Sequence, residues 1–303
     1  TGISLNELAQ GLYFVASSGI DASQAMDVMT AAAKASASGL GQTAVLADAL
    51  TSAINAYGAK NLSAAKATDI LIAAVKVGKV EGSQLAPVLG RLLPTASALG
   101  IGFEQVAGAL AVMSRTGLDA AEASTSLSAI MSTLLKPSDE AQKILRSVGL
   151  SMKDLRDMAA QPGGLIEVMR LLEKKFGDND EKLAAILPNV RAFRGVMNVL
   201  AQDSQSVDEA MREVADSLGA LDYAFDATDG TARKFAQAQA QLQAALFEIG
   251  THLLPIVSDA LDRLGKVLGW VTDLWKGLGS GAQGAAIAFA ALLASAGPLL
   301  AIL

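Results

Sequence analysis

The feature that most constrains this chain is a long helical periodicity in its C-terminal quarter. From Phe235 onward, apolar residues recur at steps of three and four as far as Leu274, which places them on one face of an α-helix. The full set is Phe235, Ala238, Leu242, Ala245, Ile249, Leu253, Val257, Ala260, Leu264, Val267, Val271 and Leu274. The pattern predicts a long amphipathic, coiled-coil-like helix over residues 222–276, called the rod below, whose apolar face needs a partner.

The heptad spacing of the rod is interrupted near its middle. Between Ala245 and Val257 the apolar residues follow three successive steps of four, which relaxes a left-handed supercoil. Pro255 lies in the same stretch and removes one backbone hydrogen bond. We therefore predict a hinge at His252 and Pro255. The residues expected to pack at an oligomer axis are Phe235, Leu242, Ile249, Leu253, Val257, Leu264 and Val271. Alternatively, the rod lays this stripe on the rest of the chain.

After Lys276 the sequence carries no charge at all. Residues 284–303 form a stretch long enough, as a helix, to cross a hydrocarbon layer of roughly 30 Å. The residues of the predicted membrane segment and its border are Trp270, Trp275, Phe289, Leu292, Leu293, Leu299 and Leu300. The alanine content and Gly297-Pro298 weaken the membrane interpretation. The same stretch could pack inside an oligomer, and the two tryptophans could be core residues.

Upstream of the rod, composition predicts an all-α protein. Hydrophobic residues make up 51% of the chain and aromatics 4%, so alanine and leucine, both strong helix formers, dominate. We expect a helical-hairpin body at 1–137, a smaller helical region at 138–221, the rod, and an apolar segment at 277–303. The helices expected from caps and breaks are 5–17, 22–37, 43–57, 63–77, one starting at 83, 138–148, 152–158, 163–176, 181–187, 190–200 and 206–218.

The first of these helices carries Leu5, Leu8, Leu12 and Val15, and its sequence is echoed 98 positions later. Residues 5–12 (LNELAQGL) followed by 18–22 (SGIDA) correspond to 103–110 (FEQVAGAL) followed by 116–120 (TGLDA). In both copies a glycine closes a helix, and an aspartate, Asp21 or Asp119, can cap the next. The echo predicts a duplicated helical hairpin, with chance similarity between alanine-rich helices as the alternative.

Candidate catalytic chemistry is sparse. The chain has no cysteine and a single histidine, His252, so a catalytic triad would depend on one residue in the middle of the rod. Carboxylate pairs such as Asp154 and Asp157 stand at helical distances from lysine or arginine, as on ordinary surfaces. The net charge is −6, without a basic run for phosphate binding. We expect a chain that is not an enzyme, with no cofactor, no metal and no sequence-specific nucleic-acid partner.

Several segments, taken together and in order, resemble the tape-measure proteins of tailed bacteriophages. They are residues 7–19 (ELAQGLYFVASSG), 49–58 (ALTSAINAYG), 90–94 (GRLLP), 116–118 (TGL), 134–138 (LLKPS), 247–250 (FEIG) and 253–255 (LLP). Each alone is an ordinary helical string. As a joint pattern they cover nearly the whole chain, and a 303-residue chain is then expected to be a segment of a longer protein that lies at the tip end of the tail.

The resemblance implies a structural virion protein that sets tail length during assembly and takes part in genome delivery through the host envelope. It implies three or six copies in the tail lumen, in contact with tail-tube, hub or tip proteins. Assembly chaperones would cover the protein in the host cytoplasm, and its apolar segments would meet the host inner membrane on ejection. The alternative from another class is a membrane-active, pore-forming helical protein not of phage origin.

Overall fold

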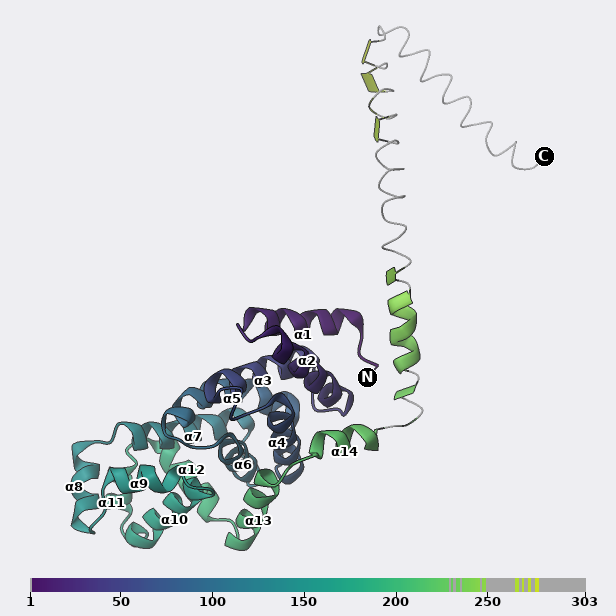
Figure 1. The fold of residues 1–303 in the computed structure, drawn as a ribbon. Helices are drawn as coiled ribbons and strands as arrows, with labels where there is room; N and C mark the ends of the chain where they lie inside the picture. The colour runs from purple at the N-terminus through teal and green to yellow at the C-terminus, as the bar shows by residue number, and fades with distance from the viewer. Residues whose placement is uncertain are drawn as a thin grey trace, which may run out of the picture. The chain divides into compact units, whose positions relative to one another are not determined.

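The structure, a computed structural model, describes residues 2–228 and, beyond them, residues 230, 233, 234, 236–245, 247, 248, 265, 266, 269, 272, 273, 276 and 277. This described part of the chain is helical and contains no strand, which confirms the all-α prediction (Figure 1). Contacts divide the chain into two compact units, Thr1–Gln241 and Leu242–Leu303. The first unit holds all the helices labelled α1 to α14.

The helix ranges expected from the sequence agree closely with helices of the structure, whereas α6, α7 and α14 had no expected bounds. Their bounds are α1 Leu5–Ser17, α2 Ala22–Ala37, α3 Thr43–Tyr57, α4 Ala64–Val77, α5 Gly82–Ala98, α6 Phe103–Ser114, α7 Ala120–Leu135, α8 Asp139–Ser147, α9 Met152–Ala159, α10 Gly164–Phe176, α11 Asp180–Ile186, α12 Val190–Leu200, α13 Ser204–Ala215 and α14 Ala220–Ala227. Residues 222–227, where the rod was expected to begin, lie in α14, which ends in a turn at Thr228.

Local capping explains many of these ends. The side chains of Ser4, Ser63 and Asp119 each accept a hydrogen bond from the backbone N–H three residues on, which satisfies one of the unpaired donors at a helix start. Asp21, expected to do the same for α2, occupies the N-cap position but makes no side-chain capping bond. Gly58 ends α3 in a left-handed conformation, with φ at +81°, which suits glycine.

The first unit is built around one contiguous hydrophobic core that includes residues from Val15 to Leu221. Helix α1 packs on α2 and α3, α3 packs on α5, and α5 packs on α7 (Figure 1). The last helices of the unit pack back on earlier ones. Helix α13 packs on α6 and α4, and α14 packs on α4 and α2. The two copies of the sequence echo, α1 with α2 and α6 with α7, are each a pair of helices in contact. The duplication itself stays a prediction, as does the division into four regions.

Among the described residues, the structure contains no helix that is both long enough and apolar enough to cross a membrane. The predicted apolar segment at 277–303 and its candidate span at 284–303 lie outside the described residues, apart from Gly277. The membrane segment stays a prediction.

Candidate functional site

The residues predicted to pack at an oligomer axis fall almost entirely outside the described part of the chain. Leu242 is described, and 61% of its surface is exposed, as is 66% of the nearby Phe247. The other predicted residues, which lie outside, are Phe235, Ile249, Leu253, Val257, Leu264 and Val271 for the axis, His252 and Pro255 for the hinge, and Trp270, Trp275, Phe289, Leu292, Leu293, Leu299 and Leu300 for the membrane segment. Their roles stay predictions.

The described residues do contain α14, the last labelled helix of the first unit, together with the side chains that hold it. The N-terminus of α14 is held by Asp69, a residue of α4 that is only 5% exposed. Its two carboxylate oxygens accept hydrogen bonds from the backbone N–H groups of Gly219 (3.0 Å) and Leu221 (2.7 Å). A carboxylate at this position pairs unsatisfied donors and interacts favourably with the positive end of the helix dipole. Asp69 thus caps a helix 150 residues further along the chain.

The sequence required a distant cap here because α14 has none of its own. Its N-cap residue is Gly219, which adopts a left-handed conformation with φ at +83° and offers no side-chain acceptor. No motif in the sequence pointed to Asp69. Its sequence surroundings could have indicated burial. Asp69 directly precedes the apolar residues Ile70, Leu71 and Ile72 in a helix with one strongly apolar face. Burying a carboxylate without a partner costs free energy, so a buried Asp69 is expected to accept hydrogen bonds from specific donors.

Charged groups on the exposed side of α14 add weaker contacts. Lys34 of α2 forms an ion pair with Asp222 at 2.8 Å, and its Nζ lies 5.7 Å from the centre of the Phe225 ring. The guanidinium of Arg233 lies 3.7 Å from the same ring centre and donates to the Phe225 carbonyl oxygen at 2.6 Å. Exposed ion pairs contribute about 0–1 kcal/mol each. The buried Asp69 carboxylate is therefore the principal polar anchor of α14.

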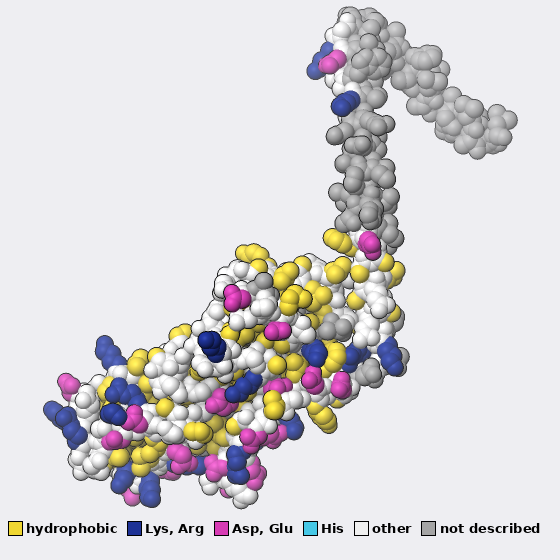
Figure 2. Space-filling model, viewed as in Figure 1, with side chains coloured by type: hydrophobic (Ala, Val, Ile, Leu, Met, Phe, Trp, Pro, Cys, Tyr) yellow, Lys and Arg dark blue, Asp and Glu magenta, His cyan; other side chains and the backbone are white. Residues whose placement is uncertain are grey.

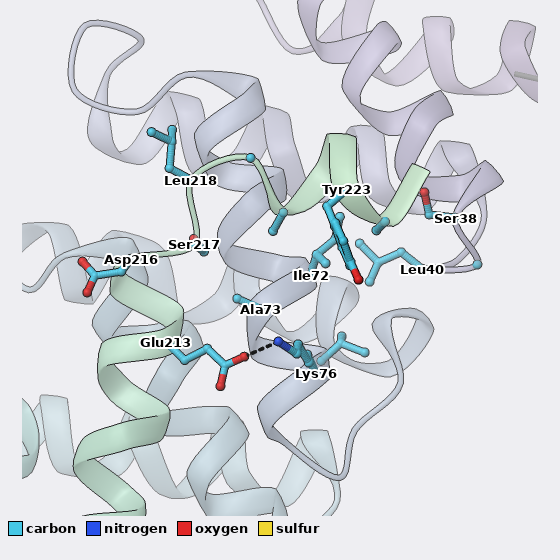
Figure 3. A pocket seen from close by; sticks show the side chains of 15 residues that line it. Ser38, Leu40, Ile72, Ala73, Lys76, Glu213, Asp216, Ser217, Leu218 and Tyr223 are labelled. Carbon is cyan, nitrogen blue, oxygen red and sulfur yellow. Dashed lines mark ion pairs between the residues drawn. The ribbon is translucent and has the colours of Figure 1, made fainter. Parts of the chain in front are cut away.

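A cavity of about 520 Å³ lies beside the linker between α13 and α14 (Figure 3). Its wall is largely aliphatic, with Leu40, Ile72 and Ala73 among the lining residues, and the Lys76–Glu213 ion pair at 2.6 Å lies at its side. Leu218 is 91% exposed and points away from the centre of the cavity in Figure 3. The linker therefore covers this apolar hollow only in part.

The side chains around this cavity do not form a recognisable catalytic arrangement. Lys76 is engaged with Glu213, and the hydrogen bond from Lys76 to that carboxylate raises the pKa of the lysine. Among the described residues, no group of three or more His, Cys, Asp or Glu side chains is placed to hold a metal ion. Elsewhere, burial raises the pKa of Tyr57, whose hydroxyl donates to the Ile101 carbonyl at 2.9 Å. That tyrosine is a packing residue with a satisfied hydroxyl.

Helix α13, which delivers the chain to α14, is fastened by Arg115 from the end of α6. The Nε of Arg115 donates to the Val77 carbonyl at 2.8 Å, and its Nη1 donates to the carbonyl and hydroxyl oxygens of Ser206 at 3.1 and 3.0 Å. One guanidinium thereby ties the C-terminus of α4 to the first turn of α13. The rigid fork of arginine suits this geometry, which lysine cannot reproduce.

Replacing Arg115 with lysine should loosen α13 without unfolding the body. Two of the three bonds would be lost, and the expected cost is about 1–3 kcal/mol, since an ordinary hydrogen bond contributes about 0.5–1.5 kcal/mol. Chemical denaturation gives the stability change directly. The control is Arg91, which is exposed and takes part in none of the ion pairs of the described residues. Arg91→Lys should leave the free energy of unfolding within about 0.5 kcal/mol of the original. Equal effects from both substitutions would contradict the proposed tie.

Comparison with known proteins places this body in a family. A family model described as phage-related minor tail protein matches residues 1–190, which is more than half of the chain. The chain belongs to this family. It is therefore a phage tail protein with a structural role, and the resemblance found in the sequence is confirmed.

Two relatives of this minor tail protein carry a more specific name. A "Tape measure protein" of Pneumococcus phage Dp-1 is 25% identical over 315 residues, which covers 100% of this chain and 26% of the relative. A "Probable tape measure protein" of Clostridium phage phiCD119 is 25% identical over 226 residues, covering 71% of this chain and 24% of the relative. The chain thus spans about a quarter of the length of these relatives. No solved structure matches it.

Proposed function

We propose that this chain is the helical-body section of a tail tape-measure protein, which sets tail length during assembly and takes part in genome delivery through the host envelope. The observation that carries the proposal is the match to a tape measure protein along the whole of this chain. The body would act as a folded anchor, and the chain leaving α14 would continue into the extended helical part.

The described residues support separate roles for a folded body and an extended helical part. The body has a closed apolar core and a polar anchor for α14 at Asp69. The second unit begins at Leu242, and its described apolar side chains Leu242 and Phe247 are largely exposed. Large apolar side chains that stay exposed call for covering by other chains. Neighbouring copies along a tail lumen would supply that cover.

The partners and locations follow from this role. We propose three or six copies of the chain in the virion, in the tail lumen near the tip, in contact with tail-tube, hub or tip proteins. Before assembly, in the host cytoplasm, tail assembly chaperones would cover the apolar stripe of the rod. On ejection, the apolar segment at 277–303 would meet the host inner membrane.

The alternative, a pore-forming protein not of phage origin, is supported by the same uncharged segment at 277–303. Membership in the minor tail protein family argues against it, because the matched residues 1–190 make up most of the helical body. Membrane leakage assays would not separate the two functions, since both predict it. A measured change in tail length would separate the two functions.

The test is an insertion in the rod, made in the phage that carries this chain. Four heptads, 28 residues, inserted after Leu242 keep the apolar stripe in phase and add about 42 Å of helix at 1.5 Å per residue. We expect tails longer by about that amount in electron micrographs of purified virions. Tails of unchanged length would contradict the tape-measure function for this part of the chain.

A matched control places the same 28 residues in the body. The turn between α8 and α9 contains Gly149, which has φ at +75° and open space around it. Exposed turns of this kind tolerate insertions. This second variant should assemble tails of the original length, because the insertion does not lengthen the extended part. Equal lengthening by both insertions would overturn the assignment of body and rod.

A further inference from the structure

Helix α1 is apolar on two sides, although only one side is covered. Gly11 and Val15 are buried and face the helices on which α1 packs. A second line of apolar residues is exposed and consists of Leu5, Ala9, Leu12 and Ala16. The exposed fraction is 41% for Leu5 and 48% for Leu12. Their steps of four, three and four keep these residues within a narrow sector of the helix. We call them the α1 stripe.

The exposed side of α1 also lacks charge. Glu7 is the only charged residue of the helix, and its Oε1 accepts hydrogen bonds from the Thr43 N–H (2.9 Å), the Thr43 hydroxyl (2.8 Å) and the Ser36 hydroxyl (3.3 Å). That carboxylate is thus used to hold α3 and α2. Figure 2 shows hydrophobic side chains gathered over the region of α1 and α2. A solvent-facing helix ordinarily carries charged residues on its outer side.

The order of side-chain sizes along the α1 stripe indicates which partner fits. Leucine and alanine alternate as Leu5, Ala9, Leu12 and Ala16. If a second α1 lies antiparallel, with the two-fold axis between residues 10 and 11, Leu5 faces Ala16 and Ala9 faces Leu12. Every large residue then meets a small one, which lets the helices approach closely and interdigitate. A parallel partner would instead place leucine on leucine and leave gaps between the alanines.

We infer that the α1 stripe is a docking surface for the α1 stripe of a second copy of this chain, in an antiparallel, two-fold arrangement. Such an interface uses the same patch on both copies, and the absence of charge on the stripe removes the like-charge repulsion that self-pairing would otherwise create. Tyr13, which follows Leu12 on the same helix and is 71% exposed, lies at one flank of the stripe and enlarges the apolar area.

The dimer formed through this surface should be weak. A helix of 13 residues is about 20 Å long, and its contact falls well below the roughly 800 Å² per partner of a standard interface. A two-fold antiparallel pair also differs from copies arranged around a tail axis with one common direction. The dimer is therefore a state of the protein outside the tail, and it does not depend on the proposed function.

Cysteine cross-linking of the 303-residue chain tests the arrangement, because these 303 residues include no cysteine. Leu5→Cys, carrying an affinity tag, is mixed with untagged Ala16→Cys under mild oxidation, and cross-linked peptides are identified by mass spectrometry. We expect the mixed 5–16 link to exceed the 5–5 and 16–16 links by about tenfold. Leu5→Cys mixed with Val190→Cys, another exposed site, gives the background from random collisions.

Four results would overturn the inference. A predominance of 5–5 and 16–16 links indicates parallel pairing, and a 5–16 yield no higher than the 5–190 background indicates no pairing through α1. Assembly through other segments, including 242–303, would raise the mass without a 5–16 link. As a second measurement, Leu12→Gln should lower the yield of the 5–16 link at least fivefold, while Leu218→Gln, at a leucine that is 91% exposed, leaves it unchanged. Equal yields in these two variants would also refute it.

Discussion

Replacing Asp69 with asparagine is expected to release α14 from the body while the core stays folded. The carboxylate accepts from the N–H groups of Gly219 and Leu221, whereas an amide offers one acceptor and turns its NH₂ toward the other donor. Loss of hydrogen bonds to a charged group at a buried position costs about 2–3 kcal/mol. Hydrogen exchange measured by mass spectrometry should show residues 220–227 exchanging about 30- to 150-fold faster.

The control for this prediction is Asp222→Asn, which removes an exposed ion pair on the same helix. Asp222 pairs with Lys34, and its side chain is 70% exposed. The expected cost is below about 0.5 kcal/mol, so exchange in α14 should change less than threefold. The prediction fails if Asp69→Asn leaves exchange in 220–227 unchanged, or if it accelerates exchange equally in α4, since that would mean that the body itself has opened.

The second large effect is expected at Gly82, the first residue of α5. A Cβ atom at this position would lie 2.1 Å from the backbone oxygen of Leu40 and 2.6 Å from its Cγ. Neither backbone can move without displacing the start of α5 or the loop after α2. Gly82→Ala should therefore destabilise the chain by about 2–3 kcal/mol, as overpacking does. Thermal unfolding should show a midpoint lower by about 5–10 °C.

Gly90 in the same helix is the matched control. A Cβ atom there would meet nothing closer than the Ser52 hydroxyl at 3.7 Å, which is ordinary contact. Gly90→Ala should therefore stabilise the chain by about 0.5–1 kcal/mol, because alanine is the better helix former. If both substitutions shift the midpoint in the same direction, the close approach of α5 to Leu40 is not the cause.

The helices could be predicted from the sequence because their ends depend on neighbours a few residues away. Ser4, Ser63 and Asp119 cap the helices that follow them, and Gly58 supplies the conformation that ends α3. Such signals operate within one turn of helix and can be read from the chain without knowing the tertiary arrangement.

The anchors of the candidate site could not be predicted in this way. Asp69 acts on backbone groups 150 residues away, and Arg115 acts on Ser206 across 91 residues, so neither role leaves a local pattern. Helix α1 illustrates a second limit. Leu5, Leu8, Leu12 and Val15 follow one another at steps of three and four, yet Val15 is buried while Leu5 and Leu12 are largely exposed. Periodicity identifies apolar residues on a helix without telling which neighbour covers each of them.

The cap supplied by Asp69 also has a consequence for how the protein is made. The ribosome adds roughly 5–20 residues per second, so Leu221 emerges about 8–30 s after the aspartate to which it binds. During that interval α1 to α12 can fold while the carboxylate is still solvated. The nascent chain therefore completes this part of its structure late, when α13 and α14 arrive together and close over the surface of α4.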